Sequence, residues 1–141
     1  MRTVQVQLGP QNYACTVTDS NHRWIIDEPV DKGGGNTGHD PYGALLASLG
    51  SCTAITLKMY AARKGWDLQS VTVDTALVTE TITDKKTTAF FRSITVTGTL
   101  DDAQLQRLQQ IAKACPISKI LEGSISIETE IKRSPSAQDD K

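Results

Sequence analysis

The sequence predicts one domain of the α+β class, built in the order strands, helix, strands, helix, strand. The length of 141 residues suits a single hydrophobic core. Segments near both ends alternate apolar and polar residues, as strands do, and a long apolar segment between them carries helix start and stop signals. This order implies an α+β fold. We expect the domain to span residues 1–133 and the tail 134–141 to be disordered.

Composition argues against several classes of protein. Lys and Arg total 15 against 16 for Asp and Glu, so no strong net charge is available to attract nucleic acid or an anionic membrane. The N-terminal residues lack the pattern of a secretory signal, which predicts a cytoplasmic protein. Three widely spaced cysteines do not resemble the disulfide framework of a secreted domain. We therefore expect thiols that either pack or carry out redox chemistry.

Three short strands are predicted before the first helix. Residues 3–8 alternate apolar and polar side chains, and after Gly9 and Pro10 the pattern resumes over 13–17, which predicts a hairpin. A third apolar piece, "HRWIID", follows the turn-prone "DSN". These segments are the first strands of the predicted fold.

The following stretch, "EPVDKGGGNTGHD", is predicted to be a flexible loop, because three consecutive glycines preclude regular structure. Gly33 and Gly38 have the spacing of a nucleotide-binding loop. However, His39 and Asp40 stand where such a loop needs a lysine and a hydroxyl residue. The loop is therefore not expected to bind phosphate.

A long central helix is predicted from Asp40 to about Gly65. Asp40 can cap free N–H groups and Pro41 suits the first helical position. Residues 42–57 carry no charge and show no single polar face, which predicts a helix buried nearly all round. The apolar run is shorter than a membrane span and contains several Ser and Thr residues. One small sheet covers only one side of such a helix, so we predict an obligate homodimer with these helices at its centre.

The second half of the chain predicts a larger hairpin, two helices and a closing strand. The hairpin comprises segments of about 68–81 and 87–100, with the turn at "TDKKT". Asp101 and Gln104 resemble a capping box at the start of an amphipathic helix. Pro116 begins the short helix "PISKILEG". The final segment, "SISIETEI", is an alternating strand whose isoleucines are expected to face inward, namely Ile125, Ile127 and Ile131.

The cysteines are the main candidates for chemistry. Cys52 has apolar neighbours at helical spacing, which should raise its pKa, so from these residues alone both a packing role and a reactive role stay open. Cys115 precedes Pro116 at a predicted helix start, where unpaired N–H groups favour a thiolate. Cys15 shares the apolar face of its strand and is expected to pack. None of the cysteines or histidines shows the short paired spacing of a zinc site, so no metal is expected.

Three stretches together resemble the OsmC/Ohr superfamily, named for osmotically inducible protein C and organic hydroperoxide resistance proteins. They are "DPYGALLASLGSCTAITLKMYAARKGW", "ITVTGTLDDAQLQRLQQIAKACPISKIL" and "SISIETEI". The earlier "DEPVDKGGGNTG" is also similar to the loop before the central helix of OsmC-like proteins. The resemblance covers almost the whole chain except the tail.

The resemblance implies an OsmC-like fold that forms an intertwined homodimer around long central helices. It also implies a thiol peroxidase, in which Cys52 attacks an organic hydroperoxide and becomes a sulfenic acid. Cys115 would then resolve it as a Cys52–Cys115 disulfide. A dithiol such as dihydrolipoamide would be the reductant, and no cofactor is expected.

The sequence departs from the superfamily at residues that activate the first cysteine. Peroxidases of this superfamily carry a glutamate ten residues before it, where this chain has Tyr42, and many OsmC-like relatives carry one at the next position, here Gly43. They also use an arginine from the N-terminal strands, but this chain has no arginine between Arg2 and Arg23. Arg23, on the third strand, is the candidate substitute.

Two functions therefore stay open at the level of sequence. The first is a cysteine-based peroxidase that reduces organic hydroperoxides. The second is a binding or general thiol redox protein on the same fold, in which a pocket beside Cys52 holds an apolar small molecule. Closeness of Cys52 and Cys115 in the folded chain favours the first, because disulfide formation requires Cα atoms within about 7 Å.

Overall fold

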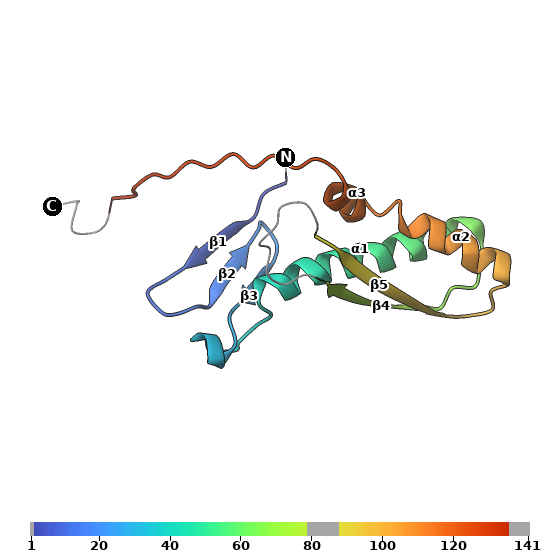
Figure 1. The fold of residues 1–141 in the computed structure, drawn as a ribbon, viewed down its shortest axis with the longest axis horizontal. Helices are drawn as coiled ribbons and strands as arrows, with labels where there is room; N and C mark the ends of the chain where they lie inside the picture. The colour runs from blue at the N-terminus through green and yellow to red at the C-terminus, as the bar shows by residue number, and fades with distance from the viewer. Residues whose placement is uncertain (1, 79–87, 136–141) are drawn as a thin grey trace.

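The computed structural model describes residues 2–78 and 88–135, and it confirms the predicted α+β class. Its strands are β1 (Gln5–Leu8), β2 (Cys15–Thr18), β3 (Arg23–Ile26), β4 (Ser70–Leu77) and β5 (Phe90–Thr97), and its helices are the 3₁₀ turn η1 (Val30–Lys32), α1 (Pro41–Lys64), α2 (Asp102–Ala112) and α3 (Pro116–Glu122). The strands form two antiparallel sheets, β1-β2-β3 and β4-β5. The first sheet lies beside the start of α1, and the second runs along the rest of this helix (Figure 1).

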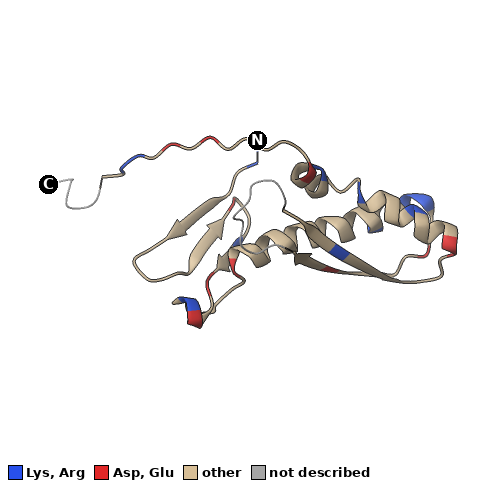
Figure 2. Cartoon of the chain, viewed as in Figure 1, with Lys and Arg blue, Asp and Glu red and all other residues tan. Residues whose placement is uncertain are grey.

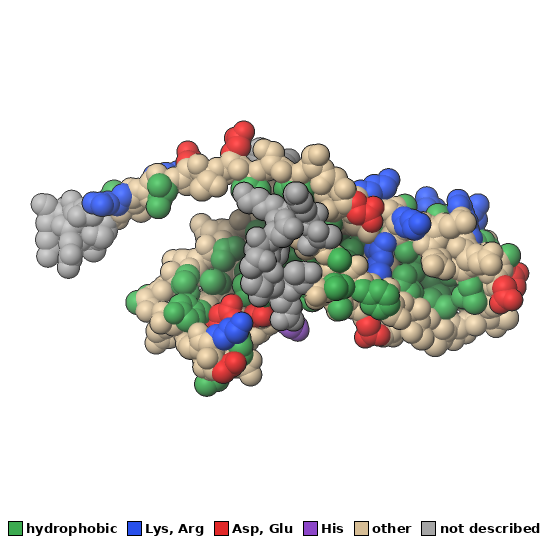
Figure 3. Space-filling view, in the orientation of Figure 1, with side chains coloured by type: hydrophobic (Ala, Val, Ile, Leu, Met, Phe, Trp, Pro, Cys, Tyr) green, Lys and Arg blue, Asp and Glu red, His purple; other side chains and the backbone are tan. Residues whose placement is uncertain are grey.

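The first sheet confirms the predicted hairpin and third strand. Val6 is paired with Val17, and Val17 with Trp24, in antiparallel register. Val17 is buried, but Val6 and Trp24 are 55% and 47% exposed. Figure 3 shows hydrophobic side chains at the surface of this part of the molecule. The described chain therefore leaves much of the apolar surface of this sheet uncovered.

The glycine-rich loop has a defined conformation, which differs from the flexible loop expected from its three glycines. The buried carboxylate of Asp27 accepts hydrogen bonds from the Gly35 N–H at 3.2 Å, the Thr37 N–H at 3.1 Å and the Thr37 hydroxyl at 2.6 Å. A Cβ atom at Gly34 would lie 2.0 Å from the Glu28 carbonyl oxygen. Glycine is needed there because the loop folds back against its own backbone. The Asp27 carboxylate at the centre of the loop accepts hydrogen bonds from the N–H groups that this fold would otherwise leave unpaired.

This arrangement predicts a stability component that is lost in acid. The Thr37 hydroxyl and three N–H groups hold the pKa of Asp27 at about 2, below its ordinary value of 3.8. A carboxylate with a depressed folded-state pKa stabilises the fold above its unfolded pKa, and this stabilisation disappears as the pH falls through the folded value. We expect Asp27→Asn to lower the melting temperature at neutral pH, and the difference from wild type to shrink below about pH 4.

The measurement is the melting temperature of both proteins between pH 7 and pH 2, followed by circular dichroism. Asp31→Asn removes an exposed carboxylate from the same loop and serves as the matched control, with little change expected at any pH. A difference between wild type and Asp27→Asn that stays constant down to pH 2 would contradict this account of Asp27.

Helix α1 begins and ends where its sequence signals predict. The Asp40 side chain accepts a hydrogen bond from the Gly43 N–H at 2.7 Å, and Pro41 occupies the first turn. Gly65 ends the helix in the left-handed region, at φ 70°, and its N–H contacts the carbonyls of the last turn. With 24 residues the helix is about 36 Å long. It is the one helix of the described chain that could span a membrane by length and composition, yet its buried face packs in the core.

The expectation that α1 is buried nearly all round depends on a second subunit, and the single chain covers only part of the helix. The buried face carries Leu49, Thr53 and Leu57, which point toward β4, β5 and α2. On other faces Ile55 is 54% exposed and Met59 is 63% exposed. Figure 2 shows that the helix is uncharged until near its C-terminal end. One two-stranded sheet and two short helices cover only part of its circumference, and uniform composition alone does not reveal which part.

The second sheet and α2 complete the core. The predicted hairpin is confirmed over Ser70–Leu77 and Phe90–Thr97, whereas its predicted turn lies outside the described residues. The capping box is confirmed, because Gln104 N–H donates to Asp101 at 2.8 Å and Asp101 N–H donates to Gln104 at 2.9 Å. The core cluster comprises Leu57, Tyr60, Ala61, Leu68, Leu108 and Ala112.

The predicted closing strand is not formed. The short helix α3 is present, but no strand is assigned over 124–135. Its three isoleucines are exposed, and Ile127 and Ile131 reach 83% and 97%. Alternation marks a segment that is suited to a sheet, but a strand needs a free sheet edge to pair with, and this segment is paired with none in the described chain. The predicted disordered tail falls mainly on 136–141, outside the described residues.

Candidate redox site

The fold brings together the two cysteines that the sequence singled out. Cys52 lies in the middle of α1 and is partly buried, whereas Cys115 caps the start of α3 and is fully buried. They are 63 residues apart in sequence, yet the two thiols are close enough for each to shift the pKa of the other. Both are free thiols. We refer to Cys52 and Cys115 as the cysteine pair.

Local contacts make the two thiols unequal. Burial raises the pKa of Cys52, and its hydrogen bond with Cys115 raises this pKa further. Burial also acts to raise the pKa of Cys115, but hydrogen bonds from the Cys52 thiol, the Ser118 N–H and the Thr53 hydroxyl outweigh it, so that the pKa is lowered. The opposite directions of the two shifts make Cys115 the more acidic thiol of the pair.

A series of buried hydrogen bonds involves Thr53, the residue that follows Cys52. The Thr53 hydroxyl is fully buried and donates to the Leu49 carbonyl oxygen at 2.7 Å. The Thr53 hydroxyl oxygen in turn accepts a hydrogen bond from Nη1 of Arg92, on β5, at 2.9 Å. Sequence reasoning missed both Thr53 and Arg92. The signal was present, because alternation along "FFRSITVT" places Arg92 on the same face as Phe90 and Ile94, where a charged residue is unexpected.

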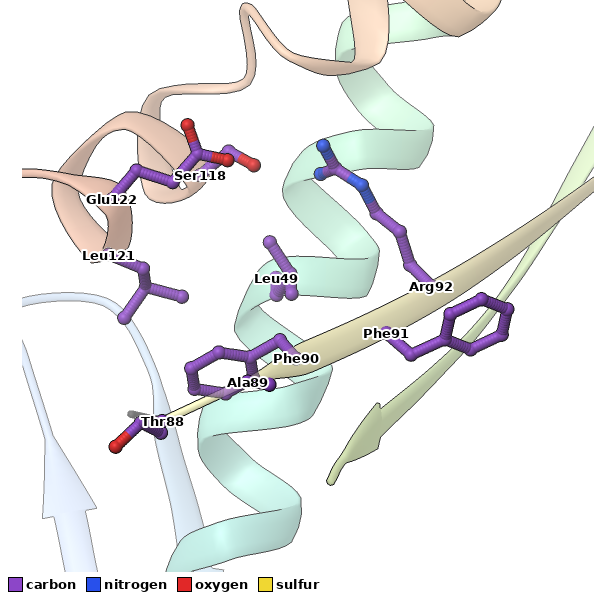
Figure 4. A pocket seen from close by; sticks show the side chains of 9 residues that line it. All are labelled: Leu49, Thr88, Ala89, Phe90, Phe91, Arg92, Ser118, Leu121 and Glu122. Atoms are coloured by element: carbon purple, nitrogen blue, oxygen red, sulfur yellow. The ribbon is translucent and has the colours of Figure 1, made fainter. Parts of the chain in front are cut away.

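A cavity of about 460 Å³ lies next to the hydrogen-bonded residues Arg92, Thr53 and Leu49. Figure 4 shows Arg92 and Phe90 on β5, Leu49 on α1, and Leu121 and Glu122 on α3 around it. Ser118, which lies in the first turn of α3 three residues after Cys115, also lines it. The two cysteine sulfurs do not line this cavity in the single chain. Its lining is mixed, with apolar side chains from Leu49, Phe90 and Leu121 and polar or charged ones from Arg92, Ser118 and Glu122.

A second hollow of about 390 Å³ lies on the other side of Arg92. Its lining residues come from α1, β5 and α2 and are mainly apolar, and they include Leu57, Ile94 and Leu105. Because Arg92 lines both hollows, its side chain forms part of the partition between them. The hydrogen bond to Thr53 holds the Arg92 guanidinium in place, and the two hollows leave space on either side of this side chain.

The structure does not bring Arg23 to the cysteine pair within one chain. Arg23 begins β3, is exposed and is paired with Thr18. Among the described residues, its side chain forms no hydrogen bond with Cys52 or Cys115. Its catalytic role stays a prediction.

Tyr42 and Gly43, where the resemblance to the superfamily implies a glutamate, lie in the first turn of α1. Tyr42 is 48% exposed, and the Gly43 N–H is used to cap the helix. These positions are about 14–15 Å along the helix axis from Cys52. A carboxylate is thus absent where relatives have one, and no other described residue supplies one to Cys52 by hydrogen bond.

Cys15 lies apart from the cysteine pair, on β2 opposite Leu8 and Ile26. It lines a shallow hollow of the first sheet together with Leu8 and Ile26, in keeping with the expected packing role. In the described residues, no group of three or more His, Cys, Asp or Glu side chains is placed to hold a metal ion.

The sequence model of the family described as OsmC-like protein matches residues 33–130. No curated protein sequence matches the chain significantly.

Several solved structures share the fold. An OsmC-like protein from Mycoplasma pneumoniae superposes with a TM-score of 0.72 at 17% identity, over 86% of each chain. A protein from Psychrobacter arcticus 273-4, described as an osmotic stress induced and detoxification response protein, gives 0.70 at 25% identity over 84% of this chain and 87% of its own. An organic hydroperoxide resistance protein OsmC from Legionella pneumophila gives 0.62 at 19% identity over 87% and 91%. With the family match covering most of the sequence, the chain belongs to the OsmC/Ohr family, which includes redox and hydroperoxide resistance proteins.

Proposed function

We propose that this protein reduces organic hydroperoxides through a disulfide cycle of the cysteine pair, in the cytoplasm. The observation that carries the proposal is that a partly exposed thiol, Cys52, lies close enough to a buried thiol, Cys115, for each to shift the pKa of the other. Two cysteines in this relation can give two electrons to a peroxide and become one disulfide. The membership of hydroperoxide resistance proteins in the same family supports this choice of oxidant.

The reaction follows from the chemistry of the pair. The Cys52 sulfur, as thiolate, attacks the terminal oxygen of the peroxide, the O–O bond breaks, and the alkoxide takes up a proton and leaves as an alcohol. Cys52 is then a sulfenic acid. The Cys115 thiolate attacks the Cys52 sulfur, forming the disulfide and releasing the hydroxyl group as water after protonation. An external dithiol such as dihydrolipoamide reduces the disulfide by exchange and restores both thiols.

The neighbouring cavity is suited to the organic part of the substrate. Leu49, Phe90 and Leu121 give it apolar walls beside α3. Apolar walls with a few polar groups are typical of small-molecule sites. We expect hydroperoxides with a hydrocarbon body to be reduced faster than hydrogen peroxide, because only they gain from burying apolar surface there.

We also propose that the functional unit is an intertwined homodimer. The described chain exposes apolar side chains in three places, which are α1 with Ile55 and Met59, the first sheet with Val6 and Trp24, and the isoleucines of segment 124–135. Exposure on this scale marks an interaction surface. A second copy would cover the open side of α1 and offer sheet edges to the unpaired C-terminal segment, as expected for two self-complementary surfaces.

A second function has specific support and is kept as the alternative. Cys52 has a raised pKa, and this chain lacks the glutamates of its relatives at Tyr42 and Gly43. Both features weaken a peroxidatic thiol. In that case the fold would bind an apolar small molecule in the cavity beside Phe90, or act as a general thiol redox protein with little peroxidase activity.

The deciding experiment is mass spectrometry of the reduced protein after one equivalent of cumene hydroperoxide. The proposal predicts that the wild type loses two hydrogens and yields a Cys52–Cys115 peptide, whereas Cys115→Ser gains one oxygen on Cys52. Thiols that stay reduced, under conditions that oxidise an active peroxidase, would overturn the proposal. If Cys52→Ser also keeps affinity for an apolar ligand, the binding function replaces it.

A further inference from the structure

The hollow between β5 and α2 has the features of a ligand site that is separate from the cysteine pair. Its volume of about 390 Å³ falls within the range of small-molecule pockets. The side chains that line it come from α1, β5 and α2, and neither Cys52 nor Cys115 is among them. A molecule bound there would therefore not be in contact with either thiol of the pair.

The sequence explains why this hollow has apolar walls. Alternation along β5 places Ile94 and Val96 on its inward face, and the helical repeat of α2 places Leu105 and Leu108 on one face. Leu105 is 40% exposed, so the apolar wall reaches the surface. Figure 3 shows hydrophobic side chains between β5 and α2, with cationic side chains next to them. The hydrocarbon part of a ligand would lose contact with water there, which favours binding.

Arg92 is the one charged residue among the described residues that line this hollow. Its Nη1 donates to the Thr53 hydroxyl at 2.9 Å, and this contact holds the guanidinium in place. A hydroxyl is neutral, so the contact leaves the positive charge of Arg92 uncompensated. It also does not use the edge formed by Nε and Nη2, which can donate two parallel hydrogen bonds to a carboxylate.

The charge of the lining distinguishes the two hollows that share Arg92. The cavity next to Leu49 also contains the carboxylate of Glu122 on α3, which repels an anion (Figure 4). Among the described residues that line the hollow between β5 and α2 there is no acidic side chain, and the other polar group is the neutral amide of Gln109. An anionic ligand is therefore favoured in the hollow between β5 and α2.

We propose that the hollow between β5 and α2 is a binding site for a small carboxylate with a hydrocarbon body. The carboxylate would pair with the Arg92 guanidinium, and the hydrocarbon would lie against Ile94, Leu105 and Leu108. Binding is non-covalent, so the ligand is held without reacting. The inference does not rest on the proposed function, because it involves neither thiol of the cysteine pair, and the site differs from the cavity beside Phe90.

The first test is isothermal titration calorimetry of the reduced full-length protein with octanoate, and with octanamide as its uncharged match. The two probes share the hydrocarbon body, so the difference between their affinities reports the contribution of the charge. We expect saturable binding of octanoate, and binding of octanamide that is weaker by about tenfold, because hydrogen bonds to charged groups contribute about that factor. Equal affinities for the two probes, or no saturable binding of octanoate, would overturn the inference.

Three variants locate the ligand. Arg92→Gln should lower the affinity for octanoate by about tenfold and leave that for octanamide nearly unchanged. Leu105→Ala removes part of the apolar wall and should weaken the binding of both probes severalfold. Leu121→Ala makes the same change in the cavity that contains Glu122, and it should alter neither affinity. Weaker octanoate binding in Leu121→Ala but not in Leu105→Ala would place the ligand in the other cavity, contrary to the inference.

Circular dichroism checks that each variant is folded, and Arg92→Lys takes the place of Arg92→Gln if the latter is not. Lysine keeps the charge but loses the planar fork, so a smaller loss of octanoate affinity is expected. Arg63→Gln removes an exposed arginine of α1 that does not line the hollow, and it should leave the affinity nearly unchanged. An unchanged affinity in the folded Arg92 variant, or an equal loss in Arg63→Gln, would show that Arg92 does not hold the carboxylate.

Discussion

Peroxide turnover should fall by more than about 10³-fold in Cys52→Ser, because this substitution removes the nucleophile and a serine hydroxyl is not ionised near neutral pH. Cys52 is the partly exposed member of the cysteine pair, so it is the sulfur that a substrate can reach. The measurement is consumption of cumene hydroperoxide with dihydrolipoamide as the reductant, at substrate concentrations that give a linear initial rate. Cys15→Ser, which changes the thiol on the first sheet, is the matched control and should keep the wild-type rate.

Cys115→Ser should give a different outcome, which separates the two roles. Cys52 loses both the acceptor of its proton and the thiol that resolves its sulfenic acid. We therefore expect one slow round of oxidation followed by a sulfinic acid on Cys52, with steady turnover lost. Full turnover by Cys115→Ser would show that the external dithiol reduces the sulfenic acid directly. Equal losses in Cys15→Ser and Cys52→Ser would contradict the assignment of the nucleophile.

Local signals predicted most of the described fold. The start and end of α1 depend on Asp40, Pro41 and Gly65, which act on their own backbone neighbours. The capping box of α2 is formed by Asp101 and Gln104, which are three residues apart. Features of this kind need no knowledge of the rest of the chain. The two antiparallel hairpins could be predicted in the same way, because side chains alternate every two residues along a strand whatever the sheet packs against.

Features that depend on distant partners could not be predicted from the same patterns. The alternation of Ile125, Ile127 and Ile131 indicates which side chains would share a face, but it contains no information on whether a sheet edge is available. In the same way, an uncharged sequence for α1 does not tell which side of the helix β4, β5 and α2 will cover. The polar contacts of Asp27 with Gly35 and Thr37 were missed because the glycines alone suggested mobility.

The candidate site likewise depends on residues that are far apart in the sequence, which local patterns do not connect. Closeness of Cys52 and Cys115 came from resemblance to a family, since no local pattern joins residues 63 positions apart. The Arg92 to Thr53 contact spans 39 positions and was not expected from that resemblance, which directed attention to the first strands and to Arg23. The local signal for the Arg92 to Thr53 contact was a charged residue on the apolar face of β5. Inward-facing charges in an alternating strand are thus useful pointers to buried partners.

The oligomeric state should respond strongly to a charge on the exposed side of α1. Ile55 and Met59 are more than half exposed in the single chain, so Ile55→Glu should leave the isolated fold nearly unchanged. In the proposed dimer the same side chain is buried, which is worth about 1.5–3 kcal/mol, and symmetry places it at the interface twice. Loss of both buried Ile55 side chains weakens association by about 10² to 10⁴-fold, because each 1.4 kcal/mol changes the dissociation constant tenfold. The cost of burying the two glutamates would weaken it further.

The measurement is the molar mass in solution, by light scattering or sedimentation, of wild type, Ile55→Glu and Gln106→Glu. Gln106 is exposed on α2, so Gln106→Glu adds the same charge to a helix surface outside the proposed interface and should remain dimeric. A wild type that is monomeric at micromolar concentration would contradict the dimer. A dimer that survives Ile55→Glu would instead place the interface on the first sheet and segment 124–135. Loss of peroxide turnover together with the dimer would show that the second chain is needed to complete the site, including any contribution from Arg23, because the cysteine pair itself is already assembled within one chain.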